Sequence, residues 1–321
     1  MAKILANDGI DSVGKQMLEK EGFTVVTDKI AQADLATQLT SFDGIIVRSA
    51  TKVTKEIIDA CPNLKLIGRA GVGMDNIEVE YAKSKGLAVV NTPAASSQSV
   101  AELVFAHLFG MVRFLHQSNR QMPVIGTEKF AELKKNYAEG IELKGKIIGV
   151  IGFGRIGQAT AKIAIGLGMN VLPYDPFVSE ATIDFDFHPE LSNDKVSIKF
   201  KTVPLEELLV KGDFLTLHVP FPKGAVPIIA KKEFDLMKQG VGIVNAARGG
   251  AIHENDLLDA LNAGKVAYAG LDVFEGEPTP KLALLQHAKI SSTPHIGAST
   301  NEAQERIGVE LAQRVIDHFK K

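Results

Sequence analysis

Tryptophan is absent from this sequence of 321 residues, and cysteine occurs once, at Cys61. A single cysteine excludes a disulfide within the chain and is typical of a reducing compartment. Neither sign of charge predominates, because the formal net charge is −2. That balance disfavours the basic footprint of a nucleic-acid-binding or membrane-surface protein. We therefore expect no nucleic-acid partner and no membrane partner.

The sequence also lacks a long uninterrupted apolar run. The first ten residues, MAKILANDGI, contain no basic region followed by a long apolar core, so they do not form a secretory signal. The most apolar stretch, residues 99–115, is interrupted by Glu102, His107 and Arg113, which makes it too polar to span a bilayer. These absences predict a cytoplasmic protein.

Short apolar segments alternate with amphipathic segments of helix length, first over residues 3–90 and again over residues 147–292. Such alternation predicts βαβ units and parallel sheets. We therefore predict an α/β fold with two doubly wound parallel-sheet domains, of which the second is larger. The predicted strands are residues 3–6, 23–26, 44–48, 65–68, 87–90, 147–151, 169–172, 213–219, 241–245, 266–271 and 289–292.

Two segments interrupt this alternation. Residues 99–115 are apolar on nearly every helical face, which implies burial at a domain or subunit junction. Residues 179–198 are polar, acidic and poorly periodic, and we interpret them as a solvated insertion near a sheet edge. Metal ligation would need a second ligand cluster, and none is evident, so no metal is assigned. The residues that raise the metal alternative are Asp184, Asp186, His188 and Glu190.

Residues 147–157, IIGVIGFGRIG, contain the spacing Gly152-x-Gly154-x-x-Gly157 directly after an apolar strand. In such a turn the first glycine allows the tight bend and the second lets the backbone approach a pyrophosphate. The third allows close packing of helix on strand, and the helix N-terminus favours the anion. This context predicts a dinucleotide site.

Asp175 follows the next predicted strand, in VLPYDP, where a dinucleotide-binding unit places a ribose-binding carboxylate. A carboxylate there would repel a 2′-phosphate, and no arginine follows it, so NAD is preferred over NADP. The alternative is a glycine-rich structural turn beside an ordinary surface aspartate. The combined strand, turn, helix and carboxylate favour the NAD site.

Three further side chains follow neighbouring predicted strands, namely Arg248, Glu277 and His295. The carboxyl ends of parallel strands meet at one sheet edge, where α/β folds bind ligands. An arginine can hold a carboxylate–carbonyl substrate, and a histidine oriented by a carboxylate can transfer a proton near neutral pH. Each residue alone could have a structural role, as an ion pair, a core histidine or a turn cap. Together, behind a dinucleotide site, they favour a catalytic set.

At these residues the chain resembles the D-isomer-specific 2-hydroxyacid dehydrogenases, from about residue 3 to its end. The resemblance implies that His295 is the acid/base for the substrate hydroxyl, that Glu277 pairs with it, and that Arg248 holds the substrate. It also implies a flavodoxin-like substrate-binding domain, residues 1–97 plus 297–321, and a Rossmann NAD-binding domain, residues 98–296. The expected cofactor contacts are Gly152, Gly154, Arg155, Ile156, Gly157, Asp175, Val219, Ala246, Ala247, Arg248, Asp272, His295, Gly297 and Ala298.

The stretches IIVRSATKVT, GRAGVGMDNI, NTPAASS and ELKGKIIGVIGFGRIG are most similar to family members that act on a phosphorylated hydroxy acid. The resemblance implies a phosphate-binding Arg48 with Arg69 nearby, and a backbone grip on the substrate carboxylate at Val72 and Gly73. Arg248 and His295 complete the expected substrate contacts. We expect an NAD-dependent enzyme that oxidises 3-phospho-D-glycerate and forms a homodimer. The alternatives are a glyoxylate or hydroxypyruvate reductase and, in another class, an NAD-sensing binding module.

Overall fold

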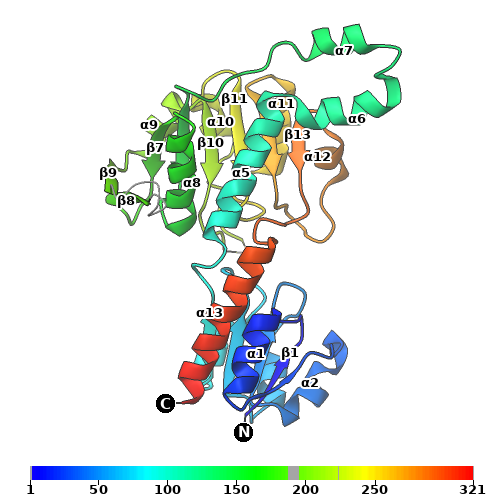
Figure 1. Ribbon diagram of the computed structural model, residues 1–321, viewed down its shortest axis with the longest axis vertical. Coiled ribbons are helices and arrows are strands. Elements are labelled where there is room, and N and C mark those ends of the chain that lie inside the picture. The colour runs from blue at the N-terminus through cyan, green and yellow to red at the C-terminus, as the bar shows by residue number, and fades with distance from the viewer. Residues whose placement is uncertain (1, 187–194, 223, 321) are drawn as a thin grey trace. The chain divides into compact units, whose positions relative to one another are not determined.

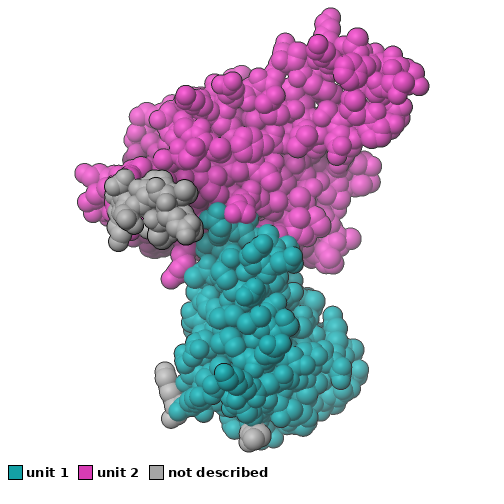
Figure 2. Space-filling model, viewed as in Figure 1, with its two compact units in different colours: residues 1–99, 298–321 teal, residues 100–297 magenta. Residues whose placement is uncertain are grey.

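The computed structural model describes residues 2–186, 195–222 and 224–320. The chain divides into two compact units, which Figure 2 shows in different colours. Unit 1 contains residues 1–99 and 298–321, and unit 2 contains residues 100–297. The chain therefore passes from one unit to the other twice.

Unit 1 is built on a parallel five-stranded sheet, in which Figure 1 labels β1. The strand order is β2-β1-β3-β4-β5. Successive side chains of a strand point to opposite faces, so both faces are apolar. Ile4 and Ile46 lie in the core on one face, while Leu5 and Ile45 lie in the core on the other. The strands are β1 (Lys3–Ala6), β2 (Thr24–Val26), β3 (Gly44–Val47), β4 (Leu66–Arg69) and β5 (Ala88–Asn91).

Helices cover both faces of this sheet, and the last helix of the chain is among them. Helix α13 packs against α1 and places Leu311 and Val315 in the core next to Ile4. Thr300 caps α13, because its hydroxyl accepts a hydrogen bond from the Ala303 N–H. The helices of unit 1 are α1 (Ser12–Lys20), α2 (Leu35–Gln38), α3 (Lys55–Ala60), α4 (Val79–Ser84) and α13 (Asn301–Phe319).

Unit 2 is built on a parallel six-stranded sheet in the order β13-β12-β11-β10-β6-β7. The strand order reverses at β6, which has β7 on one side and β10 on the other, and ligands of α/β sheets bind at such a switch point. The predicted fold class, α/β with two parallel sheets, is confirmed. The strands are β6 (Ile147–Ile151), β7 (Asn170–Tyr174), β10 (Phe214–Leu217), β11 (Val241–Asn245), β12 (Val266–Leu271) and β13 (Ile290–Ser292).

Two apolar layers cover the faces of the second sheet. Helices α5 and α8 lie in front of the strands in Figure 1 and form one layer, while α9 to α12 contribute to the other. Helices α6 and α7 extend away from the sheet. The helices are α5 (Ser97–Val112), α6 (Leu115–Ile125), α7 (Phe130–Asn136), α8 (Arg155–Gly166), α9 (Leu205–Lys211), α10 (Lys231–Leu236), α11 (Glu254–Asn262) and α12 (Leu282–Gln286).

Helix α5 differs from the prediction for residues 99–115. It ends at Val112, and Phe114 adopts a left-handed backbone conformation with φ of 53° before α6 begins. Its buried side chains, among them Val104 and Leu108, belong to the core of unit 2 itself, so their burial does not need a second chain. Within the described residues, no single helix is long and apolar enough to cross a membrane, although the bent pair α5 and α6 passes that test of length and composition together.

The part of the predicted insertion at residues 179–198 that the structure describes is largely exposed and follows the edge strand β7, as expected, but it has regular structure. Strands β8 (Glu180–Asp186) and β9 (Lys195–Lys201) form an antiparallel pair. Ile183 is buried in the core of unit 2, and the Phe200 ring packs edge-on against Phe153. Alternate apolar residues on two short strands supply this face, although the charged residues between them mask it in the sequence. His188 and Glu190, considered as metal ligands, lie outside the described residues.

Candidate active site

The glycine-rich turn lies between β6 and α8, at the switch point of the second sheet. Gly152 has a positive φ of 94°, and a Cβ atom there would stand 2.6 Å from the His218 carbonyl oxygen. A Cβ atom on Gly157 would stand 2.1 Å from the Gly152 carbonyl oxygen. Gly154 instead faces open space. The first and third glycines are therefore required by packing, while the second leaves the backbone accessible to a ligand.

Asp175 follows β7 and lies beside this turn. One carboxylate oxygen accepts a hydrogen bond from the Phe153 N–H at 2.7 Å, and the other accepts from the N–H groups of Phe177 and Val178 at 2.8 and 3.1 Å. The carboxylate is thus fixed next to the glycine turn. Because each oxygen has two lone pairs, Asp175 retains acceptor capacity for a ribose hydroxyl. The turn and the carboxylate together fit a dinucleotide.

The other expected cofactor residues of this region border the same turn. Arg155 and Ile156 are the first residues of α8, whose N-terminus favours an anion. The Val219 side chain, just after β10, would be 2.8 Å from a Cβ atom on Gly152. The residues after β6, the residues after β10 and the start of α8 therefore lie next to one another around the glycine turn.

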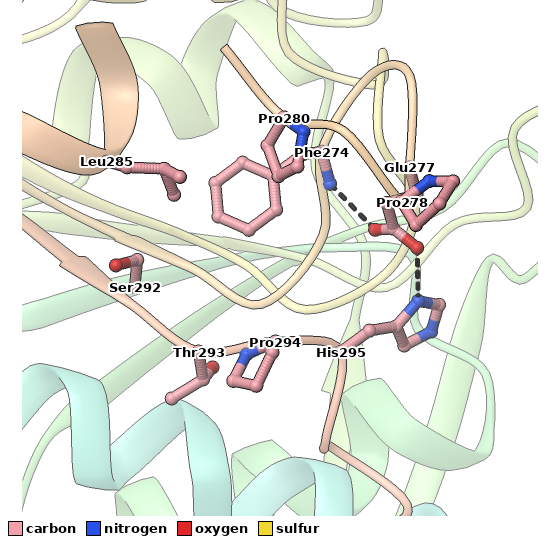
Figure 3. A pocket seen from close by; sticks show the side chains of 9 residues that line it. All are labelled: Phe274, Glu277, Pro278, Pro280, Leu285, Ser292, Thr293, Pro294 and His295. Carbon is pink, nitrogen blue, oxygen red and sulfur yellow. Dashed lines mark hydrogen bonds and ion pairs between the residues drawn. The ribbon is translucent and has the colours of Figure 1, made fainter. Parts of the chain in front are cut away.

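Glu277 and His295 form a hydrogen-bonded pair, shown in Figure 3. The Glu277 Oε2 atom lies 2.8 Å from Nδ1 of His295, and Oε1 accepts a hydrogen bond from the Phe274 N–H at 2.9 Å. Partial burial opposes ionisation of Glu277, but the bonds from His295 and Phe274 and the charge of Arg248 outweigh it and lower the pKa of the carboxyl group. Glu277 is therefore a carboxylate at neutral pH.

A pocket of about 400 Å³ opens beside this pair. Figure 3 shows the Phe274 ring and the Leu285 side chain at one end and the Glu277–His295 pair at the other. Most of the lining residues are apolar, so the Glu277–His295 pair supplies polar groups at one end of a largely apolar pocket. The lining residues are Phe274, Glu277, Pro278, Pro280, Leu285, Ser292, Thr293, Pro294 and His295.

Arg248 follows β11 in a turn that Asn245 organises. The Asn245 side-chain amide donates a hydrogen bond to the Arg248 carbonyl at 2.8 Å, and its oxygen accepts one from the Ala247 N–H at 3.1 Å. The Arg248 guanidinium donates to the Ala247 carbonyl at 2.7 Å. The positive charge of Arg248 helps to lower the pKa of Glu277, so the arginine lies close enough to interact electrostatically with the Glu277–His295 pair. Ala246 and Ala247 are buried in the same turn.

Asp272 is buried and holds the segment that carries His295. One carboxylate oxygen accepts hydrogen bonds from the Thr293 hydroxyl at 2.7 Å and the Ile296 N–H at 2.8 Å. The other accepts from the Gly297 N–H at 2.8 Å. The sequence predicts a cofactor contact for this residue. In the structure, both of its carboxylate oxygens hold the loop that carries His295.

The remaining expected substrate residues lie in unit 1. Arg69 ends β4 opposite Val47 of β3, and Arg48 follows Val47, so both arginines occupy the carboxyl edge of the first sheet. The Arg48 backbone is held on two sides, because its N–H donates to Asp8 at 2.8 Å and its carbonyl accepts from Asn76 at 2.6 Å.

Val72 and Gly73 lie in the loop that follows Arg69. The Asn91 side-chain amide donates a hydrogen bond to the Val72 carbonyl at 2.7 Å, and the Thr92 N–H donates to the Gly71 carbonyl at 3.0 Å. Ala298, expected among the cofactor contacts, also belongs to unit 1. Asn91, the last residue of β5, and Thr92, which follows it, therefore fix the course of the loop at Gly71 and Val72.

The sequence analysis missed the residues that hold Arg248 and the loop of His295. It assigned no role to Asn245 or Thr293, and it left His107 and His218 unassigned. Asn245 and Thr293 stand next to the ends of β11 and β13, so their positions were the available signal. No signal in the sequence pairs His107 with Thr293, because α5 and β13 are far apart in the chain.

Comparisons with known proteins identify the family of this chain. Residues 105–297 match the family model described as D-isomer specific 2-hydroxyacid dehydrogenase, NAD binding domain. The chain is 40% identical over 317 residues to a hydroxypyruvate reductase of Thermotoga maritima, covering 98% of this chain and 97% of that protein. It is also 40% identical over 321 residues to a D-3-phosphoglycerate dehydrogenase of Archaeoglobus fulgidus, covering 100% of this chain and 57% of that protein.

The fold has solved counterparts as well. A glyoxylate reductase from Paecilomyes thermophila superposes with a TM-score of 0.81 at 27% identity, covering 100% of this chain and 96% of that chain. The protein belongs to the D-isomer-specific 2-hydroxyacid dehydrogenase family. It is an NAD-dependent oxidoreductase. The chain spans 57% of the length of the phosphoglycerate dehydrogenase that it matches.

Proposed function

We propose that the protein oxidises 3-phospho-D-glycerate to 3-phosphohydroxypyruvate with NAD⁺, the reaction that enters serine synthesis. The Glu277–His295 pair beside Arg248 is the observation that carries the oxidation of a 2-hydroxy acid. Arg48 and Arg69, at one edge of the first sheet, support a phosphorylated substrate, because guanidinium groups bind phosphate through paired hydrogen bonds.

One ring nitrogen of His295 carries the proposed proton transfer. Glu277 is ionised and can only accept, so Nδ1 of His295 carries the proton between them. Nε2 is then an acceptor and takes the proton of the substrate hydroxyl. Bound NAD⁺ would supply the acceptor for the hydride that leaves C2, and loss of that hydride and of the hydroxyl proton leaves a carbonyl at C2. Arg248 binds the substrate carboxylate and fixes C2 for this step.

In the proposed function, Gly152, Gly154, Gly157 and Asp175 hold the dinucleotide. The carboxylate of Asp175 would accept from the adenosine ribose, and the start of α8 would receive the pyrophosphate. Val72 and Gly73 donate backbone N–H groups to the substrate carboxylate. Arg48 binds the phosphate, and Arg69 adds a second positive charge.

The test follows NADH oxidation at 340 nm with 3-phosphohydroxypyruvate, hydroxypyruvate and glyoxylate. We expect the largest kcat/KM with the phosphorylated acid. Arg48→Ala should lower kcat/KM for that acid by about 10-fold or more and leave hydroxypyruvate nearly unchanged, since one lost charge-assisted bond contributes about 1.5–3 kcal/mol. Arg314→Ala, in which an exposed helical arginine of unit 1 paired with Glu310 is removed, is the matched control.

One relative favours a second candidate function. The hydroxypyruvate reductase of Thermotoga maritima matches this chain over nearly the whole of both sequences. Equal or higher rates with hydroxypyruvate or glyoxylate, together with no effect of Arg48→Ala, would assign the protein to that activity. Tight NADH binding without turnover of any of the three acids would instead favour an NAD-sensing module.

We further propose that the protein is a cytoplasmic homodimer. Helices α6 and α7 extend from unit 2 and expose apolar side chains, among them Val124 at 75% and Phe130 at 59%. Exposed apolar groups on a projecting pair of helices favour contact with a second copy. Light scattering should give twice the monomer mass for the wild type. Val124→Asp with Phe130→Asp should give the monomer mass, and an unchanged mass would contradict this interface.

A further inference from the structure

A chain of hydrogen bonds connects helix α5 to the loop that carries His295. Nδ1 of His107 lies 2.9 Å from the Ser291 hydroxyl, and Nε2 lies 3.1 Å from the Thr293 hydroxyl. The Thr293 hydroxyl lies 2.7 Å from Asp272. The link therefore runs from Ser291 through the imidazole and Thr293 to a buried carboxylate.

The carboxylate of Asp272 at one end sets the direction of donation along this series of hydrogen bonds. The Asp272 carboxylate can only accept, so Thr293 donates its hydroxyl proton to it. The Thr293 oxygen must then accept from Nε2 of His107, which carries the ring proton. Nδ1 is left as an acceptor for the Ser291 hydroxyl. Every polar atom of the neutral imidazole is satisfied in this arrangement, and burial favours it by lowering the pKa of His107.

Close packing of α5 against β12 fixes the position of the His107 ring. His107 is 3% exposed, and its Cβ atom would stand 2.7 Å from a Cβ atom built on Gly270 of β12. Any side chain at position 270 would therefore push α5 away from the sheet. The glycine lets the helix come close enough for the ring to reach β13 on one side and the loop on the other.

The carboxylate at the end of the chain grips the loop on the C-terminal side of His295. Asp272 accepts from the N–H groups of Ile296 and Gly297 at 2.8 Å each. His295 itself has a φ of 55°, a left-handed conformation that a residue with a Cβ atom adopts only when its surroundings hold it. Thr293 braces the other side of His295, so the loop is held on both sides of the strained residue.

We propose that His107 is a positioning residue for catalysis: through Thr293 and Asp272 it holds the His295 loop in the conformation in which His295 meets Glu277. The role rests on the proposed acid/base function of His295. His107 itself touches neither the Glu277–His295 pair nor Arg248 in the bonds described above. Its effect is therefore on the alignment of the acid/base group and not on cofactor binding at the glycine turn.

The first experiment needs no substrate. Amide hydrogen exchange of Ile296 and Gly297 reports how often the loop opens. His107→Leu, which keeps the bulk but removes both ring nitrogens, should raise exchange at these two amides by about 10-fold or more. His107→Gln, which offers an amide N–H to Thr293, should restore most of the protection. Val104→Ala, one turn earlier on α5 and buried in the same core, is the control for general loss of packing.

Kinetics supply the second experiment. His107→Leu should lower kcat by about 10-fold or more while the KM for the keto acid stays within about twofold. His107→Gln should recover kcat, whereas Val104→Ala should lower Tm and leave kcat unchanged. A merely structural role would lower Tm in both His107 variants and leave kcat unchanged.

The outcomes separate this inference from the proposed function. Wild-type protein that turns over no keto acid defeats the proposed function, and the exchange of Ile296 and Gly297 then still decides whether His107 holds the loop. Unchanged exchange and unchanged kcat in His107→Leu overturn the inference. Failure of His107→Gln to restore either property overturns the hydrogen-bond explanation. If His107→Leu does not fold, Thr293→Val breaks the same chain at its next member and should show the same two effects.

Discussion

The Glu277 carboxylate is held at both oxygens, by Nδ1 of His295 at 2.8 Å and by the Phe274 N–H at 2.9 Å. A carboxylate bound at one oxygen alone could rotate, whereas two bonds fix its plane. The imidazole that depends on it is fixed in turn. The pair therefore presents Nε2 of His295 in one orientation and one tautomer.

Glu277→Gln should lower kcat by about 10²-fold or more, because a neutral amide neither orients the imidazole as strongly nor stabilises the imidazolium that forms. NADH binding should persist, since the glycine turn is not altered. Stopped-flow measurement of the chemical step with 3-phosphohydroxypyruvate and NADH checks this, with NADH fluorescence titration as the control. A kcat within threefold of wild type would remove Glu277 from the catalytic set.

Asn245→Ala should raise KM for the keto acid by about 10-fold, because Arg248 then loses the side-chain amide that holds its carbonyl, a bond that contributes about 1 kcal/mol or more when buried. The Kd for NADH should change less. Steady-state kinetics measure both quantities. Asn262→Ala, at the exposed end of α11, is the matched control and should leave KM unchanged. Equal KM values for the two variants would contradict the role of Asn245.

Gly152→Ala should weaken NADH binding by 10-fold or more and lower Tm. The new methyl group meets the His218 carbonyl at 2.6 Å, and the positive φ of 94° disfavours any residue with a Cβ atom. Gly166→Ala is the opposite control. Its Cβ atom has nothing within 4 Å, and a helical glycine replaced by alanine raises stability by about 0.5–1 kcal/mol. Thermal unfolding of both variants should show a lower Tm for Gly152→Ala and a higher Tm for Gly166→Ala. NADH titration should show weaker binding for Gly152→Ala alone.

His218 should make the protein less stable as the pH falls. His218 as a whole is partly exposed, but its ring atom Nδ1 is buried and has no hydrogen-bond partner among the described residues. Burial lowers the pKa of His218 to about 3. The unfolded chain therefore binds a proton that the folded protein refuses between about pH 6.5 and 3. Stability is full above pH 6.5 and falls below it by up to roughly 1.4 kcal/mol per pH unit.

Urea unfolding at several pH values tests this prediction. His218→Gln is uncharged at every pH, so it should lack the histidine contribution to the slope between pH 6.5 and 4. Other titrating groups act equally in both proteins, and the comparison removes them. Parallel curves for the wild type and the variant over that range would contradict the assigned cause.

The sequence by itself determined the fold class and the dinucleotide turn. Short apolar segments and amphipathic segments of helix length alternate clearly enough to predict parallel sheets. Strands such as β6 (Ile147–Ile151) and β11 (Val241–Asn245) lie where they were predicted. These features are local, because a strand, a glycine turn and a helix N-terminus depend on residues that adjoin in the chain. The hairpin of β8 and β9 was missed, since its apolar face is shared with charged neighbours and becomes visible only against α8 and the sheet.

Only the tertiary structure decided how the candidate catalytic groups are held. The order of Arg248, Glu277 and His295 along the chain indicated one sheet edge, but it did not indicate that Asn245 and Asp272 hold the loops that carry them. Nor does any local pattern connect His107 to Thr293, which are 186 residues apart. Such contacts arise where the strand order of the sheet and the approach of α5 over Gly270 place distant residues within hydrogen-bond reach, and this juxtaposition is a property of the packed fold.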